Sequence, residues 1–178
     1  MVDDRTPVFI LTGPASRAEL LDRWLPMPAF AGTVVLRNAE ASSPMAGGCF
    51  CCAGQGDLIR SLRELLPRAR RGEVKRVVID TADYADPAKI AEAIQADRAT
   101  AAVYRLGGVI AFVDGVAGFG DGPVAGIDRI VIAGELSDTT RQIIQKNDTE
   151  MHYLSEIFDP KLIFHEIPGR RLRRQVVP

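Results

Sequence analysis

All three cysteines of the chain lie in one short stretch, GGCFCC at residues 47–52. Cys49, Cys51 and Cys52 offer three soft thiolate ligands within four positions. Such a donor set suits zinc or copper(I) and, less often, cobalt or nickel. Cys49 and Cys51 point the same way in an extended loop, and the two preceding glycines permit the turn that would also bring in Cys52. The stretch predicts a thiolate metal site whose fourth ligand comes from water, a partner or another side chain.

Two other interpretations of the cysteine stretch stay open. Three cysteines cannot all pair within one chain, and clustered cysteines in a reducing compartment favour metal or redox chemistry over a disulfide framework. The stretch could therefore hold a redox pair between Cys49 and Cys51, or be a thiol loop that has lost its role.

The composition excludes several classes of protein. The chain has 178 residues, of which 47% are hydrophobic and 25% charged, so we expect one globular domain over residues 1–178. Its net charge of −1 gives no general attraction to nucleic acid or to a membrane surface. No apolar run approaches the roughly 20 residues of a membrane span, and the acidic start, MVDDRTP, is unlike a signal peptide. We expect a cytoplasmic protein.

The elements that must position the cysteines alternate between strands and helices. Apolar, β-branched runs predict strands, and several are continuously apolar, as in strands buried on both faces. These runs are 7–13, 32–38, 75–82, 107–115, 128–135 and 161–169. The alternation predicts a three-layer α/β/α sandwich with a mainly parallel sheet.

Helix-like stretches fill the gaps between the predicted strands. The first is SRAELLDRWL, with Ser16 and Glu19 as a capping box. The second starts at Asp57 and ends near Gly72, and the third has Asp86 as N-cap and Pro87 in its first turn. The remaining two are DTTRQIIQKN and EMHYLSEIF. The glycine-rich segment 115–126 lacks the strand–turn–helix context of a phosphate loop and predicts a surface loop.

Taken in order, five segments resemble the CobW-like branch of the metal-handling P-loop GTPases, relatives of the urease and hydrogenase nickel-insertion GTPases. The segments are VFILTG, GGCFCCAGQGDL, VVIDTADYADP, VIAFVDG and DRIVIAGEL, and the resemblance covers roughly residues 7–169. It implies a P-loop NTPase fold and a zinc or cobalt site at Cys49, Cys51 and Cys52. The separate C-terminal domain usual in the family is not expected here.

The segment that should bind phosphate departs from the family pattern. A phosphate loop has the form G-x-x-x-x-G-K-[ST], whose lysine reaches the phosphates and whose hydroxyl holds Mg²⁺. This chain has GPASRAEL at 13–20, which keeps Gly13 but has Ala18, Glu19 and Leu20 at the last three positions. Gly13 is thus the one remaining candidate for nucleotide contact, and a helix cap is the simpler role for Glu19.

Two further nucleotide elements have changed as well. The base-reading motif should fall at 133–136, where the chain has AGEL, and Asp83 replaces the glycine that would face the terminal phosphate. GTP binding is therefore not expected, and the chain is interpreted as a degenerate GTPase. Asp80 and Asp83, three residues apart at a strand end, are candidate cation ligands or solvated loop acids.

The remaining conspicuous residues predict structure rather than chemistry. His152 and His165 stand alone, the arginine-rich tail GRRLRRQVVP predicts a solvated end, and Trp24 and Phe30 are expected in the core. No residues form a convincing catalytic pair.

Three hypotheses about function follow. The first is a metal-binding protein, for zinc or a similar ion, that traffics or senses the metal without hydrolysing a nucleotide and serves a metalloprotein client. The second is an interaction module that pairs with itself or with an intact paralogue. The third is a nucleotide-dependent metallochaperone whose missing groups come from a partner. None of the three implies nucleic acid or a membrane as a partner.

Overall fold

The computed structural model describes residues 3–13, 17–37, 54–82, 85–115, 126–135, 137–146, 150–153 and 164. Within these ranges the strands are β1 (Thr6–Thr12), β2 (Thr33–Arg37), β3 (Arg76–Asp80), β4 (Tyr104–Asp114), β5 (Arg129–Ala133) and β6 (Glu150–Tyr153). The helices are α1 (Ala18–Trp24), α2 (Gln55–Arg70), α3 (Pro87–Ala96), α4 (Arg98–Ala101) and α5 (Asp138–Lys146), with a short 3₁₀ turn, η1, at Pro28–Phe30.

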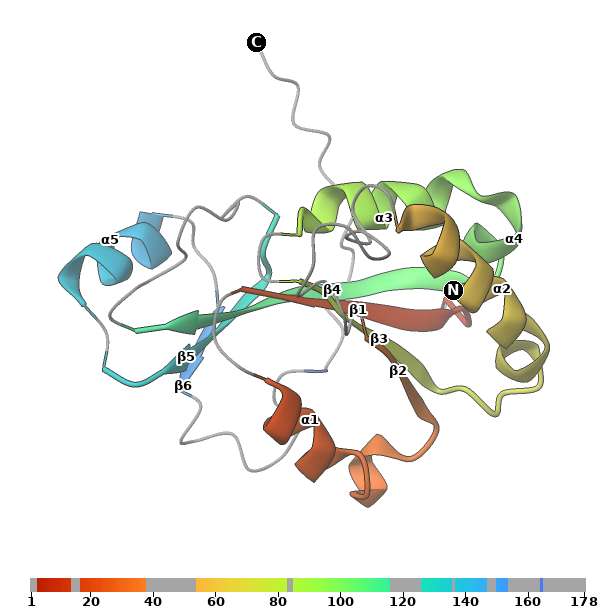
Figure 1. The fold of residues 1–178 in the computed structure, drawn as a ribbon, viewed down its shortest axis with the longest axis horizontal. Helices are drawn as coiled ribbons and strands as arrows, with labels where there is room; N and C mark the ends of the chain where they lie inside the picture. The colour runs from red at the N-terminus through yellow and green to blue at the C-terminus, as the bar shows by residue number, and fades with distance from the viewer. Residues whose placement is uncertain are drawn as a thin grey trace, which may run out of the picture.

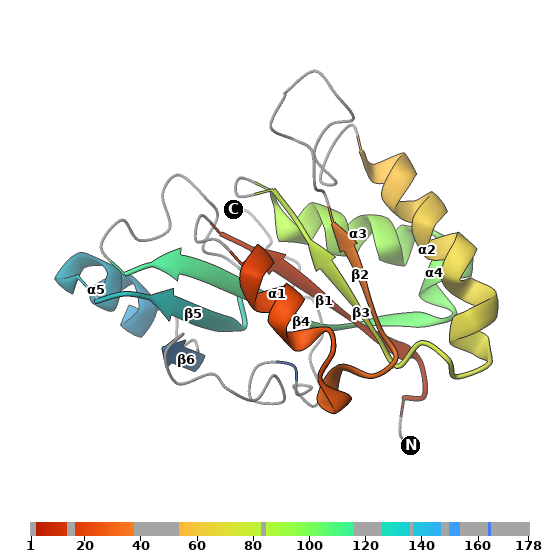
Figure 2. The same ribbon diagram turned by 60° about the horizontal axis from the view of Figure 1, so that its bottom comes forward.

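The strands form one six-stranded sheet in the order β2-β3-β1-β4-β5-β6. Every strand pair of this sheet is parallel, with Ile10 of β1 opposite Ile79 of β3 and Val109 of β4. Helices α2, α3 and α4 cover one face and α1 lies on the other (Figure 1, Figure 2). The prediction of an α/β/α sandwich with a parallel sheet is confirmed.

Alternating residues of the strands feed two cores on opposite faces of the sheet. Val8 and Ile10 pack with the leucines of α2, whereas Phe9 and Leu11 pack with α1. The second set, which we call the α1 core, includes Trp24 and Phe30 at 1% exposure, as the sequence predicted. Phe164 packs edge-on against both rings in this core. It is the one described residue of the strand expected at 161–169.

Helix α2 leads out of the cysteine stretch and is fixed by its apolar stripe. Leu58, Leu62 and Leu66 recur every four residues and are buried. The Tyr104 hydroxyl of β4 donates to the Leu62 carbonyl at 3.0 Å, and burial raises the pKa of Tyr104 to about 12. The helix begins at Gln55 rather than at Asp57, because Gly54 is its N-cap and Asp57 lies within its first turn.

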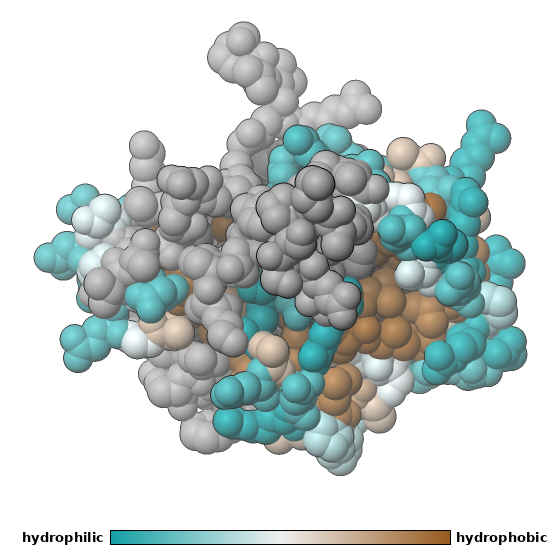
Figure 3. Space-filling model, viewed as in Figure 1, coloured by the Kyte–Doolittle hydropathy of each residue, from teal (hydrophilic) through white to brown (hydrophobic). Residues whose placement is uncertain are grey.

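The edge strand β2 leaves hydrophobic surface beside α2. Val34 and Leu36 are only half-buried and pack with Ile59 of α2 against the core. Figure 3 shows a hydrophobic area next to α2, on the side where β2 and β3 lie in Figure 1.

Two further helix predictions differ from the structure. Helix α1 begins at Ala18, and its N-cap is Arg17 without a side-chain cap, whereas the sequence predicted Ser16 at this position. The expected capping box between Ser16 and Glu19 stays a prediction, because Ser16 lies outside the described residues. The stretch EMHYLSEIF, expected to be a helix, begins as strand β6. Residues 150–153 pair with β5, and this long-range pairing overrides the local preference.

The third predicted helix is confirmed at its start and divided at its end. Asp86 caps α3 by accepting from the Ala88 amide at 2.9 Å, and Pro87 occupies the first turn. Asp97 has an extended backbone that separates α3 from α4, and it caps α4 through the Thr100 amide. No described helix combines the length and the hydropathy needed to cross a membrane.

We expect Asp97→Asn to reduce the dependence of stability on acid pH. The ion pair with Arg63, helped by the Thr100 amide, lowers the pKa of Asp97 from 3.8 to about 2. A lowered folded-state pKa stabilises the protein above pH 3.8 and loses that contribution as the pH falls toward 2. Asparagine keeps the cap but cannot titrate. Urea unfolding at several pH values should show a shallower acid loss for Asp97→Asn than for wild type, with Asp86→Asn as control; an unchanged slope would contradict the assignment.

Candidate functional site: the carboxyl ends of β1 and β3

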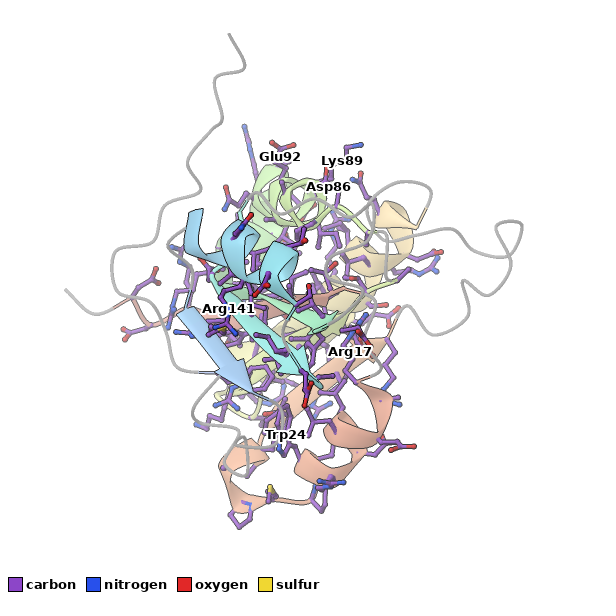
Figure 4. All side chains as sticks on the ribbon, turned by 90° about the vertical axis from the view of Figure 1, so that its left-hand side faces the viewer. Arg17, Trp24, Asp86, Lys89, Glu92 and Arg141 are labelled. Carbon is purple, nitrogen blue, oxygen red and sulfur yellow. The ribbon has the colours of Figure 1, made fainter. Side chains whose placement is uncertain are left out.

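In open parallel sheets, ligands bind beyond the carboxyl ends of the strands. These ends face the viewer in Figure 4, where Arg17 lies beside them and Trp24 lies in the α1 core. The segment that resembles a phosphate loop, 13–20, follows directly from β1, and Asp80 ends the neighbouring strand β3. The sequence resemblance therefore places any nucleotide here.

The centre of this region is filled by a side chain of the protein itself. Arg17 is 6% exposed, and its Nε donates to the Asp80 carboxylate at 2.5 Å. One terminal nitrogen donates to the Gly13 carbonyl at 2.7 Å, and the other donates to the Thr81 carbonyl. The guanidinium thus joins the end of β1 to the end of β3 through three oxygen atoms.

The strand ends around Arg17 are tied together by further hydrogen bonds. The Thr81 hydroxyl donates to the Leu11 carbonyl at 2.7 Å, and the Thr81 amide reaches the same oxygen at 3.1 Å. The Thr12 hydroxyl donates to the Ala85 carbonyl at 3.4 Å. Both threonines are 4% exposed, and both of their hydroxyl groups have hydrogen-bond partners within the protein.

Gly13 is required by packing. Its φ is +100°, a conformation that side chains rarely adopt, and an added Cβ would lie 2.1 Å from the Phe112 carbonyl oxygen of β4. The close approach of β1 to β4 accounts for a glycine at position 13 without the need for a bound phosphate. The prediction that Gly13 contacts a nucleotide stays untested.

The two residues at the lysine and hydroxyl positions of a phosphate loop have other surroundings. Glu19 is exposed in the first turn of α1. Leu20 is 8% exposed and packs in the α1 core. Neither residue supplies a cation or a hydroxyl at the strand ends.

The carboxyl end of β5 is where a base-reading motif would lie. Ala133 ends the strand, Gly134 turns with φ +84°, and Glu135 is exposed. These residues bring no side-chain amide or lysine to the turn.

The cysteine stretch lies in the segment that joins β2 to α2. Strand β2 ends at Arg37 and α2 begins at Gln55. Cys49, Cys51, Cys52 and also Asp83 lie outside the described residues. Among the residues that the structure does describe, no three histidine, cysteine or acidic side chains are grouped as metal ligands. Asp80, the described half of the predicted cation pair, is bound to Arg17 instead.

An open groove of about 920 Å³ lies between α2 and α3. Arg60, Arg63 and Asp97 line it, but Arg17 and Asp80 do not. The groove is therefore separate from the strand-end site.

Sequence reasoning missed Arg17, whose guanidinium makes three hydrogen bonds to described residues at the strand ends. The available signal was an arginine within the altered phosphate loop and an aspartate at the end of β3. Their partnership spans 63 residues, so no local pattern contained it.

The comparisons with known proteins agree with this architecture. Residues 31–157 match the model of the CobW/HypB/UreG nucleotide-binding domain. Because the match covers more than half of the chain, the protein belongs to the CobW/HypB/UreG family, whose members have a P-loop GTPase fold. The matched range begins after Gly13 and Arg17.

Individual relatives include a zinc chaperone. A stretch of 81 residues is 34% identical to the zinc chaperone YjiA of Escherichia coli K12, covering 44% of this chain and 26% of that protein. The Zn(II)-bound YjiA GTPase of E. coli has a TM-score of 0.62 and 19% identity. A Zn(II)-bound triple mutant of YjiA gives a TM-score of 0.63 and 20% identity. Each structural match covers 90% of this chain but 61% of the other, and shows the shared fold.

Proposed function

We propose that this chain is a metal-binding protein of the CobW family. It holds zinc, or a similar ion such as cobalt, nickel or copper, through Cys49, Cys51 and Cys52. It passes the ion to a metalloprotein client, or senses it, in a reducing compartment such as the cytoplasm. It does so without hydrolysing GTP.

One observation carries the metal part of this proposal. The three thiols stand together in the segment between β2 and α2, inside the range that matches the family model. Their chemistry fits a soft ion, since thiolates bind Zn²⁺ in tetrahedral sites and also take copper(I). A relative named as a zinc chaperone and Zn(II)-bound structures of the same fold support zinc as the first ion to test.

The arrangement at the strand ends supports the part of the proposal that the protein acts without hydrolysing GTP. Arg17 occupies the centre, Glu19 is exposed, and Leu20 is in the core. A bound magnesium–GTP complex would need Asp80 free of its partner and would bring phosphate toward the Glu19 carboxylate in the first turn of α1. Repulsion of like charges at contact distance amounts to about 4 kcal/mol at an effective dielectric of about 20.

A zinc titration with and without magnesium–GTP tests both parts together. We expect one zinc ion per chain, bound with the same affinity in both conditions. We also expect millimolar magnesium–GTP to leave the melting temperature unchanged. A ligand at about 100 times its Kd would stabilise the fold by about 2.7 kcal/mol, which a thermal scan detects easily.

The other hypotheses predict different titrations. A nucleotide-dependent metallochaperone would show a raised melting temperature with GTP and a zinc affinity that changes with it. An interaction module would bind no zinc under either condition. Either result would contradict the proposal.

A further inference from the structure

Within the described residues, Arg17 donates to three oxygen atoms of the kind that also binds hard cations. They are one carboxylate oxygen, from Asp80, and the backbone carbonyl oxygens of Gly13 and Thr81. Carboxylate and carbonyl oxygens are the ligands of hard metal ions in proteins. An arginine guanidinium has five N–H donors in a rigid fork and no acceptor, so it can satisfy such a set from one centre.

This set of oxygen atoms lies at the carboxyl ends of the strands, where ligands bind in open parallel sheets. It joins the carboxyl ends of β1 and β3, next to the segment that resembles a phosphate loop. The Asp80 side chain is 14% exposed and Arg17 6%, so the pair is nearly dry. A buried acid and a buried base at such a position are costly to separate, because each would be left as an uncompensated charge.

We propose that the Arg17 guanidinium is a built-in cation that takes the place of a magnesium–nucleotide complex. It holds the ends of β1 and β3 in one fixed arrangement, so the strand ends do not depend on a ligand. Arg17 is a positioning residue in this account, acting on Gly13, Asp80 and Thr81. The statement that Arg17 replaces a magnesium–nucleotide complex rests on the proposed loss of nucleotide binding. The statement that Arg17 holds the ends of β1 and β3 together does not.

Chemical rescue separates this role from general packing. We expect Arg17→Ala to lower the melting temperature by about 6–20 °C, as the loss of one partner of a buried ion pair does in a domain of this size. Methylguanidinium chloride, well below denaturing concentrations, should raise the melting temperature of Arg17→Ala but not that of wild type. Tetramethylammonium chloride at equal concentration controls for ionic strength. Arg23→Ala, at an exposed position on the same helix, should melt like wild type and show no rescue.

Asp80 provides the decisive comparison. The double variant Arg17→Ala/Asp80→Asn has lost the Asp80 carboxylate that the guanidinium contacts, so methylguanidinium should raise its melting temperature less than that of Arg17→Ala. Arg17→Lys should melt between wild type and Arg17→Ala, since it keeps the charge without the fork; it also serves if the alanine variant does not fold.

Three results would overturn the proposal. These are a wild-type melting temperature for Arg17→Ala, the absence of rescue by methylguanidinium, and equal rescue with and without the Asp80 carboxylate. Zinc binding is not measured in this test, so a failure of the metal proposal leaves its outcome unaffected.

Discussion

Replacing Gly13 with alanine is expected to lower the free energy of unfolding by about 2–6 kcal/mol. Two costs add. A left-handed backbone at a residue with a Cβ costs about 1–3 kcal/mol, and forcing a new atom into a packed site costs about 1–3 kcal/mol more. The structure gives both causes, a φ of +100° and a Phe112 carbonyl oxygen 2.1 Å from the added atom.

The same substitution elsewhere provides the control. Gly56 lies in α2, and an added Cβ there meets nothing within 4 Å. Gly56→Ala should therefore leave stability unchanged or raise it by up to about 1 kcal/mol. Urea unfolding of both variants measures the difference. If Gly13→Ala is as stable as wild type, the packing explanation for this glycine is wrong and its role must lie with a ligand.

Replacing any one of Cys49, Cys51 and Cys52 with serine is expected to weaken zinc binding by at least about tenfold. Loss of one thiolate removes one of three protein ligands, and even changes outside the ligand set cost about 10–100-fold in metal affinity. Competition with a chromophoric zinc chelator, under reducing conditions, measures each variant.

The pattern among the three single variants distinguishes the alternatives. A thiolate site requires all three variants to be impaired. A redox pair between Cys49 and Cys51 does not involve Cys52, so it requires that Cys52→Ser have the same zinc affinity as wild type. A thiol loop without a role requires that wild type and variants alike bind no zinc.

Strands β1, β3, β4 and β5 could be predicted from sequence because continuous apolar runs indicate burial on both faces, whereas β2 was predicted from its β-branched run although it is only half-buried. FILT of β1 and VIAFV of β4 have this form, and the structure buries both. Helix α3 was predictable because Asp86 and Pro87 encode its start locally. Its division from α4 was missed although Asp97, three residues before Thr100, is itself a capping signal.

The features that escaped prediction depend on distant partners. Strand β6 forms because residues 150–153 lie against β5, where Ile130 pairs with Met151. Arg17 is buried because it donates hydrogen bonds to Asp80 and Thr81, which lie at the end of another strand. A sequence pattern reports neighbours along the chain, whereas both features are decided by neighbours across the sheet.

The central claim is that the cysteines hold a metal ion. The metal content of the protein, purified under reducing conditions beside a variant with serine at positions 49, 51 and 52, tests it most directly. We predict about one zinc per wild-type chain, as a closed thiolate site would retain, and none in the variant. No zinc in the wild type, even after the metal is added back, or equal zinc in both proteins, would contradict the account.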